Sequence, residues 1–216
     1  MQKFIAIFPL RLVVYPGQQL NLHIFEERYK QLIRECFENG KTFAIPPVID
    51  SYIYEYATEI RLAEIVHTTP TGEMDIRTEA TGILKVLEVI PNVPDKLYSA
   101  AIVSEVPHLP FDTDELNSQL YELILKLHRQ LGTGFDPYKK FSRPLSFDVA
   151  SYCALPLPLQ CRLLEISSEK QRQLALIQHL MQVIPTLEET EKLRERVNMN
   201  GHFRNEIPPE HFGFRK

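Results

Sequence analysis

The strongest constraint on this chain is a change in the period of its hydrophobic pattern near residue 108. In the first half, apolar side chains come in short β-branched and aromatic runs. Within residues 74–80, uncharged side chains alternate regularly with charged ones. A period of two is typical of a half-buried strand, whereas a repeat every three to four residues is typical of an amphipathic helix. Beyond Pro110 the helical repeat takes over. The sequence therefore predicts a β-rich lobe over residues 1–108 and a helical lobe over residues 109–197.

The first lobe contains six or more short predicted strands and only one predicted helix. The first strands are expected at residues 4–8, 12–15 and 18–24. The helix is expected over residues 25–37, and Asn39-Gly40 supplies a left-handed C-cap. Parallel strands need long crossover connections, and no regular alternation of strand and helix is visible, so the strands should pair antiparallel. We predict an α+β fold whose first lobe is a closed or nearly closed β barrel with one helix.

The second lobe is predicted to be a bundle of amphipathic helices. Its last apolar stripe, Leu174, Ile177, Met181 and Ile184, is expected to face the core. Proline removes a backbone donor from a helix, so this helix is expected to end at Pro185. Residues 198–216 lack a helical period but carry several large apolar side chains. This tail is expected either to pack on the body of the protein or to dock on something else.

Composition narrows the functional classes. The chain has 216 residues, 44% of them hydrophobic, and a net charge of −4, which suits one domain of two lobes. Proteins that bind the phosphate backbone of nucleic acids are usually strongly basic, so nucleic acid is not an expected partner. Three cysteines are too few for a disulfide framework, and the first apolar run, residues 4–10, is too short for a signal peptide or a membrane span. We expect a cytoplasmic protein that makes no membrane contact.

Motifs for chemistry are weak. Gly40-Lys41-Thr42 resembles the end of a phosphate-binding loop, but Glu35 stands where that loop needs a glycine. No two of the seven histidines have metal-ligand spacing, and no nucleophile elbow is present. Cys153 lies among apolar residues, where a thiol is usually inert. The sequence therefore predicts no catalytic residue, no cofactor and no metal.

Three tyrosines form the one aromatic pattern of interest. Tyr52, Tyr54 and Tyr56 alternate, so their rings share one face if the segment is extended. Such a face could bind an extended peptide, because tyrosine adds contact area at low entropic cost. The same rings could instead pack on the barrel core or on the neighbouring lobe, and this second interpretation is favoured.

The opening segment Phe8-Pro-Leu-Arg-Leu-Val-Val-Tyr-Pro-Gly17 resembles the start of the N-terminal domain of Lon proteases. Phe25-Glu-Glu-Arg-Tyr29 stands where that family begins its helix, residues 60–89 are similar to its long hairpin, and residues 148–184 are similar to its later helices. The resemblance implies a PUA-like β barrel followed by a helical bundle. It also implies binding of unfolded or degron-bearing polypeptides.

The sequence lacks both the Walker A motif and the Ser–Lys protease module of full-length Lon. We therefore expect a stand-alone, non-catalytic substrate-binding protein, with a separate ATPase or protease as an open possibility. The expected peptide-binding residues are Tyr15, Pro16, Gly17, Tyr52, Tyr54 and Tyr56. Two alternatives stay open: a hydrolase whose site is assembled from distant segments, and an RNA-binding protein, since the PUA-like class includes RNA binders.

Overall fold

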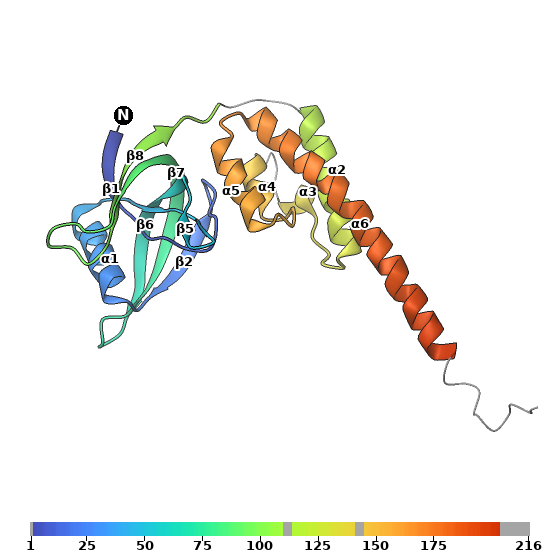
Figure 1. Cartoon of the computed structure of the whole chain (residues 1–216), viewed down its shortest axis with the longest axis horizontal. Coiled ribbons are helices and arrows are strands. Elements are labelled where there is room, and N and C mark those ends of the chain that lie inside the picture. Colours follow the sequence, from blue (N-terminus) through green and yellow to red (C-terminus); the bar gives the residue numbers. More distant parts are fainter. Residues whose placement is uncertain (1, 110–113, 141–144, 204–216) are drawn as a thin grey trace, which may run out of the picture.

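The computed structural model describes residues 2–109, 114–140 and 145–203, which form a sheet lobe and a helical lobe (Figure 1). The strands are β1 Gln2–Ala6, β2 Gln19–Ile24, β3 Phe43–Ile45, β4 Val48–Ile49, β5 Tyr52–Ile53, β6 Tyr56–Thr68, β7 Met74–Ile90 and β8 Ala100–Val106. The helices are α1 Glu27–Asn39, α2 Asp114–Gln130, α3 Pro137–Lys140, α4 Ser146–Ala150, α5 Leu157–Glu165 and α6 Glu169–Phe203. The predicted α+β class is confirmed.

The main sheet has six strands, and all pairs between its named strands are antiparallel, as predicted. Its order is β1-β8-β7-β6-β3, and β2 pairs with the first part of β7. The predicted alternation is present in β7, where Met74, Ile76, Thr78 and Ala80 are buried. At 17 residues β7 is long enough to pair with β2, β6 and β8, and its register with β6 shifts at several points. Such shifts bend a strand, which lets one strand serve several neighbours.

The two ends of this strand order meet at one point. Ile7, just after β1, forms a parallel bridge with Ala44 of β3, and the Phe8 N–H donates to the Ala44 carbonyl at 2.8 Å. The expected strand at residues 12–15 is wrong. There the Val14 carbonyl accepts from the Thr58 hydroxyl at 2.5 Å, and the Tyr15 N–H donates to the Gln18 side chain at 3.0 Å. The backbone of this segment is satisfied by side chains in place of a neighbouring strand.

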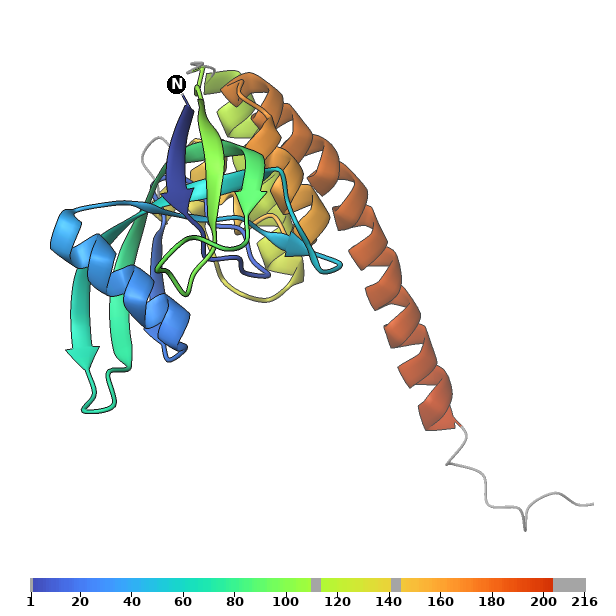
Figure 2. The same cartoon turned by 60° about the vertical axis from the view of Figure 1, so that its left-hand side comes forward.

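Helix α1 packs across one face of the sheet lobe (Figure 2). It buries Tyr29, Leu32, Ile33 and Cys36 in the core that it shares with β3, β6 and β7. Gly40 follows it with φ +62°, so the predicted left-handed cap is confirmed. The two ends of the predicted apolar stripe, Phe25 and Phe37, are exposed and do not reach the core.

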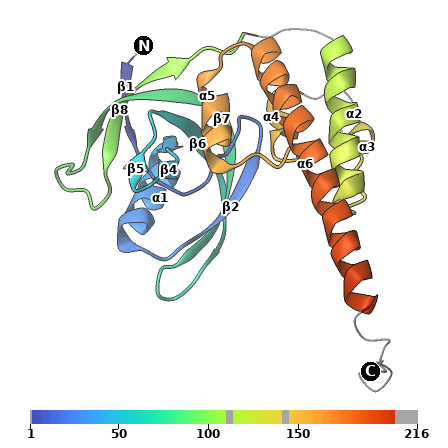
Figure 3. The same cartoon turned by 45° about the vertical axis from the view of Figure 1, so that its right-hand side comes forward.

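The helical lobe has its own core, in which α2 and α6 lie side by side (Figure 3). The face of α6 that enters this core carries Leu176, Ile177, Leu180 and Ile184. Two members of the predicted stripe, Leu174 and Met181, are exposed instead. The buried face of α6 is rotated from the expected one, because it also includes the buried polar residues Glu169, Arg172 and Gln173 at the start of the helix.

Pro185 does not end α6, contrary to the prediction, and the helix continues to Phe203. Proline deprives the Met181 carbonyl of its helical donor, but this turn of the helix is exposed and water can replace the donor. The Thr186 hydroxyl also donates to the Gln182 carbonyl at 3.0 Å. Residues 198–203 of the predicted tail belong to α6, and residues 204–216 lie outside the described residues. Within the described chain, no helix combines the length and the apolar character needed to cross a membrane.

Candidate functional site

A groove opens in the sheet lobe where β1 and β3 move apart. We call it the edge groove, and its volume is about 500 Å³. Residues 3–6 of β1 form one wall, residues 40–42 before β3 form the other, and α1 together with the loop from Val93 to Tyr98 completes the lining. The bridge between Ile7 and Ala44 marks the closed end of the groove.

Strand β1 turns an unpaired backbone edge toward this groove. The Ile7 N–H donates to the Ser99 carbonyl at 2.9 Å, and the register pairs Ile5 with Ala101. In an antiparallel pair, alternate residues bond to the partner strand and those between them point away from it. Ile5 and Ile7 therefore bond toward β8, and the N–H and C=O of Phe4 point to the groove side. An unpaired edge of this kind is a template for another strand.

The side chains around the groove are partly apolar and are held in place by ion pairs. The Phe4 side chain is exposed, with a relative accessibility of 55%. The Lys3 ammonium donates to Glu59 at 2.8 Å, and the Thr42 hydroxyl donates to the same carboxylate oxygen at 2.6 Å. This shared carboxylate links β1 to the segment before β3, so the two walls are held at a set separation.

Glu35 of α1 lies between two donors on the opposite side of the groove. Lys96 donates to it at 2.8 Å, and the Tyr98 hydroxyl donates at 2.6 Å. Burial tends to raise the pKa of Glu35, but the hydrogen bonds from Lys96 and Tyr98 outweigh it and leave the pKa below its ordinary value. Glu35 therefore stays ionised and neutralises Lys96.

Lys41 is the lining cation without such a partner. It is exposed, and among the described residues no hydrogen bond or ion pair to its ammonium is found. The surrounding lobe, residues 1–108, carries a net charge of −4. Lys41 is thus a local positive charge at a groove on an acidic lobe.

The predicted loop site has a structural role in this arrangement. Tyr15 is buried, its ring stacks on Phe147 of α4 at 5.2 Å, and its hydroxyl donates to the Gln160 carbonyl at 3.2 Å. Pro16 borders a pocket of about 350 Å³ that also includes Phe147. Gly17 adopts φ +85°, and its N–H donates to the Ala80 carbonyl at 2.8 Å. Through the contacts of Tyr15, this loop of the sheet lobe packs against the helical lobe.

The three alternating tyrosines do not form one surface. Tyr52 lies in the β4–β5 hairpin and is 79% exposed. The Tyr54 hydroxyl donates to Glu165 of α5, and Tyr56 packs against the core of the helical lobe. The chain turns between β5 and β6, so the segment is not extended throughout. The rings of Tyr54 and Tyr56 therefore follow the second interpretation, packing on the neighbouring lobe.

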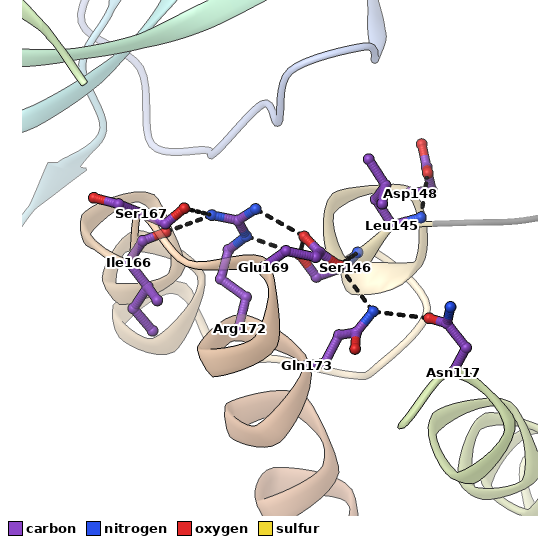
Figure 4. Close-up of polar contacts among 9 residues, drawn as sticks. All are labelled: Asn117, Leu145, Ser146, Asp148, Ile166, Ser167, Glu169, Arg172 and Gln173. Atoms are coloured by element: carbon purple, nitrogen blue, oxygen red, sulfur yellow. Dashed lines mark hydrogen bonds and ion pairs between the residues drawn. The ribbon is translucent and has the colours of Figure 1, made fainter. Parts of the chain in front are cut away.

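A buried polar network joins Ser146 of α4 to Glu169 and Arg172 of α6 in the helical lobe (Figure 4). Arg172 pairs with Glu169 at 2.7 Å, and both side chains are at most 3% exposed. The Arg172 Nε donates to the Ser146 hydroxyl at 2.9 Å, and its guanidinium lies 4.2 Å from the centre of the Phe147 ring. The network also includes the Ile166 and Ser167 carbonyls and the Gln173 amide. It positions the aromatic ring on which Tyr15 stacks.

The three thiols are all buried. Burial raises the pKa of Cys36 to about 11, of Cys153 to about 12 and of Cys161 to about 11. The thiolate is the reactive form, so these side chains stay unreactive near neutral pH. In the part of the chain that the structure describes, no group of three or more His, Cys, Asp or Glu side chains is placed to hold a metal ion.

These raised pKa values predict a loss of stability in alkali. Below pH 9, the ordinary pKa of a thiol, Cys153 is protonated in both states and its contribution is fully present. Above pH 9 the unfolded chain loses this proton while the folded protein keeps it until about pH 12. The free energy of unfolding should therefore fall by about 1.4 kcal/mol per pH unit for this thiol. Urea denaturation in reductant at pH 8–11 measures the slope, and Cys153→Ala should make it shallower. Equal slopes for the two proteins would contradict the assignment.

Sequence reasoning missed the edge groove. One weak signal was available, since lysine is common on edge strands and Lys3 lies in the first strand. Nothing local, however, shows that residues 3–6 lie across from residues 40–42.

Comparison with known proteins supports the sequence resemblance. The ATP-dependent protease La (LON) substrate-binding domain family matches residues 5–182. No curated protein matches the chain in sequence. A Lon N-terminal domain protein from Xanthomonas campestris is similar in structure, with a TM-score of 0.61 and 24% identity over 81% of this chain and 97% of that chain. The N-terminal domain of a Mycobacterium avium complex Lon protease gives a TM-score of 0.61 and 15% identity, covering 83% of this chain and 98% of that chain.

At these identities the solved structures show a shared fold, and the family match covers most of the chain. The chain belongs to the Lon substrate-binding domain family.

Proposed function

We propose that this protein binds unfolded or degron-bearing polypeptide segments without altering any bond in them, and that the edge groove is the binding site. The family supports a polypeptide-binding role. In this proposal the sheet lobe is a PUA-like barrel left open at one seam, and the helical bundle supports it. The protein acts in the cytoplasm, and a separate ATPase or protease would process what it holds.

The observation that carries the proposal is the free backbone edge at Phe4 beside an open groove. An extended segment that pairs with β1 gains main-chain hydrogen bonds from the Phe4 N–H and C=O, and these bonds are independent of its sequence. Its side chains then meet the Phe4 ring and the apolar part of the groove. This combination suits a protein that must hold many different unfolded chains. Ordering a flexible segment costs free energy, so we expect a Kd of about 1 μM to 10 μM.

Phe4→Ala should weaken this binding about tenfold. Covering the exposed ring contributes about 1–1.5 kcal/mol, roughly half the value for full burial of a phenylalanine, because part of the ring is already covered. Fluorescence anisotropy with a fluorescein-labelled, permanently unfolded protein measures the affinity. The matched control is Phe25→Ala, because the Phe25 side chain is similarly exposed at 60% and does not line the groove.

The outcome that contradicts the edge groove is a specific one. If Tyr52→Ala abolishes binding and Phe4→Ala has no effect, the β4–β5 hairpin is the binding surface. If no labelled chain binds at concentrations up to several hundred micromolar, the polypeptide-binding function itself is wrong.

The strand-pairing step has its own test. A short peptide that binds is compared with a version carrying N-methyl groups on alternate amides, which keeps every side chain and removes the donors facing one neighbour. Methylation in one of the two alternating sets should abolish binding, and methylation in the other set should not. Equal affinities for both sets would show that the segment does not pair with β1.

A further inference from the structure

A second hollow adjoins the edge groove at Lys41. This hollow has a volume of about 330 Å³ and shares Cys36, Gly40 and Lys41 with the edge groove. Its remaining lining includes Phe37, which is 65% exposed, and Leu62 of β6. A segment that leaves the edge groove over Lys41 therefore meets a second, partly apolar surface.

Lys41 and Phe4 line opposite walls of the edge groove. The parallel bridge joins Ile7 to Ala44, so the same register counted back three residues places Lys41 opposite Phe4. Both residues line the groove, which agrees with this placement. The positive charge thus stands between the exposed ring of Phe4 on one side and that of Phe37 on the other.

The other cations near this path already have partners. Lys3 is paired with Glu59 at 2.8 Å, and Lys96 is paired with Glu35 at 2.8 Å. Arg61 of the second hollow is paired with Glu79. A bound carboxylate therefore gains most from Lys41, and a bound ammonium at the same place meets an uncompensated like charge.

We infer that the site selects extended segments in which an acidic residue stands between two apolar residues. The apolar residues occupy the edge groove and the second hollow, and the acidic residue pairs with the Lys41 ammonium. This inference rests on the proposed function, since it names the class of segment that the same site prefers. Because the Lys41 ammonium is exposed to solvent, salt screens its attraction for the acidic residue and weakens the preference.

The test uses three labelled peptides that differ at one position. Each has a large apolar residue on either side of a central Glu, Gln or Lys, so that Glu and Gln differ in charge but hardly in shape. At 50 mM salt we expect the Glu peptide to bind about tenfold more tightly than the Lys peptide, with the Gln peptide between them, and the difference to shrink to about twofold at 500 mM salt. Lys41→Glu should reverse the order of the three peptides.

Lys139→Glu is the matched control, because it makes the same change in net charge at an exposed side chain of the helical lobe. It should leave the order unchanged. Phe37→Ser should weaken all three peptides to a similar degree, since the second hollow contacts an apolar residue common to them.

Two failures can be told apart. If the three peptides bind equally and Phe4→Ala still weakens them, the proposed function stands and the acidic preference is overturned. The preference is also overturned if it persists unchanged in Lys41→Glu. If none of the peptides binds, the proposed function fails together with the inference.

Discussion

Arg172→Met should lower the free energy of unfolding by about 3–5 kcal/mol. Arg172 is 3% exposed and pairs with Glu169, whose side chain is 1% exposed. The guanidinium also donates to the Ile166 carbonyl at 2.5 Å and to the Ser167 carbonyl at 3.0 Å. Methionine fills much of the volume but leaves the Glu169 carboxylate buried without its positive partner. Removing one member of a buried pair costs more than the pair itself contributes, because the remaining charge has lost its compensation.

Urea denaturation followed by circular dichroism measures this change. Lys126→Met is the matched control, because Lys126 pairs with Glu188 at 3.0 Å but both side chains are well exposed. An exposed pair contributes less than about 1 kcal/mol. The double variant Arg172→Met with Glu169→Gln should recover part of the loss, since no buried charge remains. If Arg172→Met and Lys126→Met have equal effects, the network in Figure 4 does not stabilise the lobe as described.

Tyr15→Ala should lower the free energy of unfolding by a similar amount, about 3–5 kcal/mol. The Tyr15 side chain is 2% exposed and belongs to the same core as Phe147 and Leu164, although it comes from the sheet lobe. Alanine would leave a cavity between the two lobes that neither lobe can fill without moving. Tyr15→Phe keeps the ring and removes only the hydrogen bond to the Gln160 carbonyl, so it should cost about 1 kcal/mol.

Tyr52→Ala serves as the control, because its side chain is 79% exposed and its replacement should change stability by less than about 0.5 kcal/mol. The same variants decide whether Tyr15 contacts bound peptide. Tyr15→Phe should leave the peptide affinity unchanged, since the ring faces the helical lobe. A large loss of affinity in Tyr15→Phe, with stability intact, would show that the loop at residues 15–17 belongs to the binding site.

Local patterns account for the parts of the fold that were predicted correctly. The alternation in residues 74–80 is a property of consecutive side chains, and it reappears as the buried face of β7. The helix before Gly40 and its left-handed cap follow from a stripe and a glycine that are adjacent in sequence. The antiparallel pairing followed from the absence of crossover helices, which is again visible along the chain.

The errors occur where distant segments decide which face is covered. Pro185 is a strong local signal for a helix end, yet α6 continues because the carbonyl left without a donor lies on an exposed turn. Leu174 and Met181 have the right spacing for a core stripe, but the lobe takes up an adjacent face of the helix. Tyr15 lies in a turn that looks exposed in sequence, and only the packing of α4 and α5 against it makes it a core residue.

The chain's own sequence determined the two lobes, the antiparallel strands, the first helix and the family, because each of these follows from side chains that are near one another along the chain. The tertiary structure alone decided where the edge groove lies. Phe4 and Lys41 are opposite one another only because the sheet curves until its two ends meet at Ile7 and Ala44 and then separate. Which backbone edge stays unpaired depends on that closure, and closure depends on contacts between residues that are far apart in sequence.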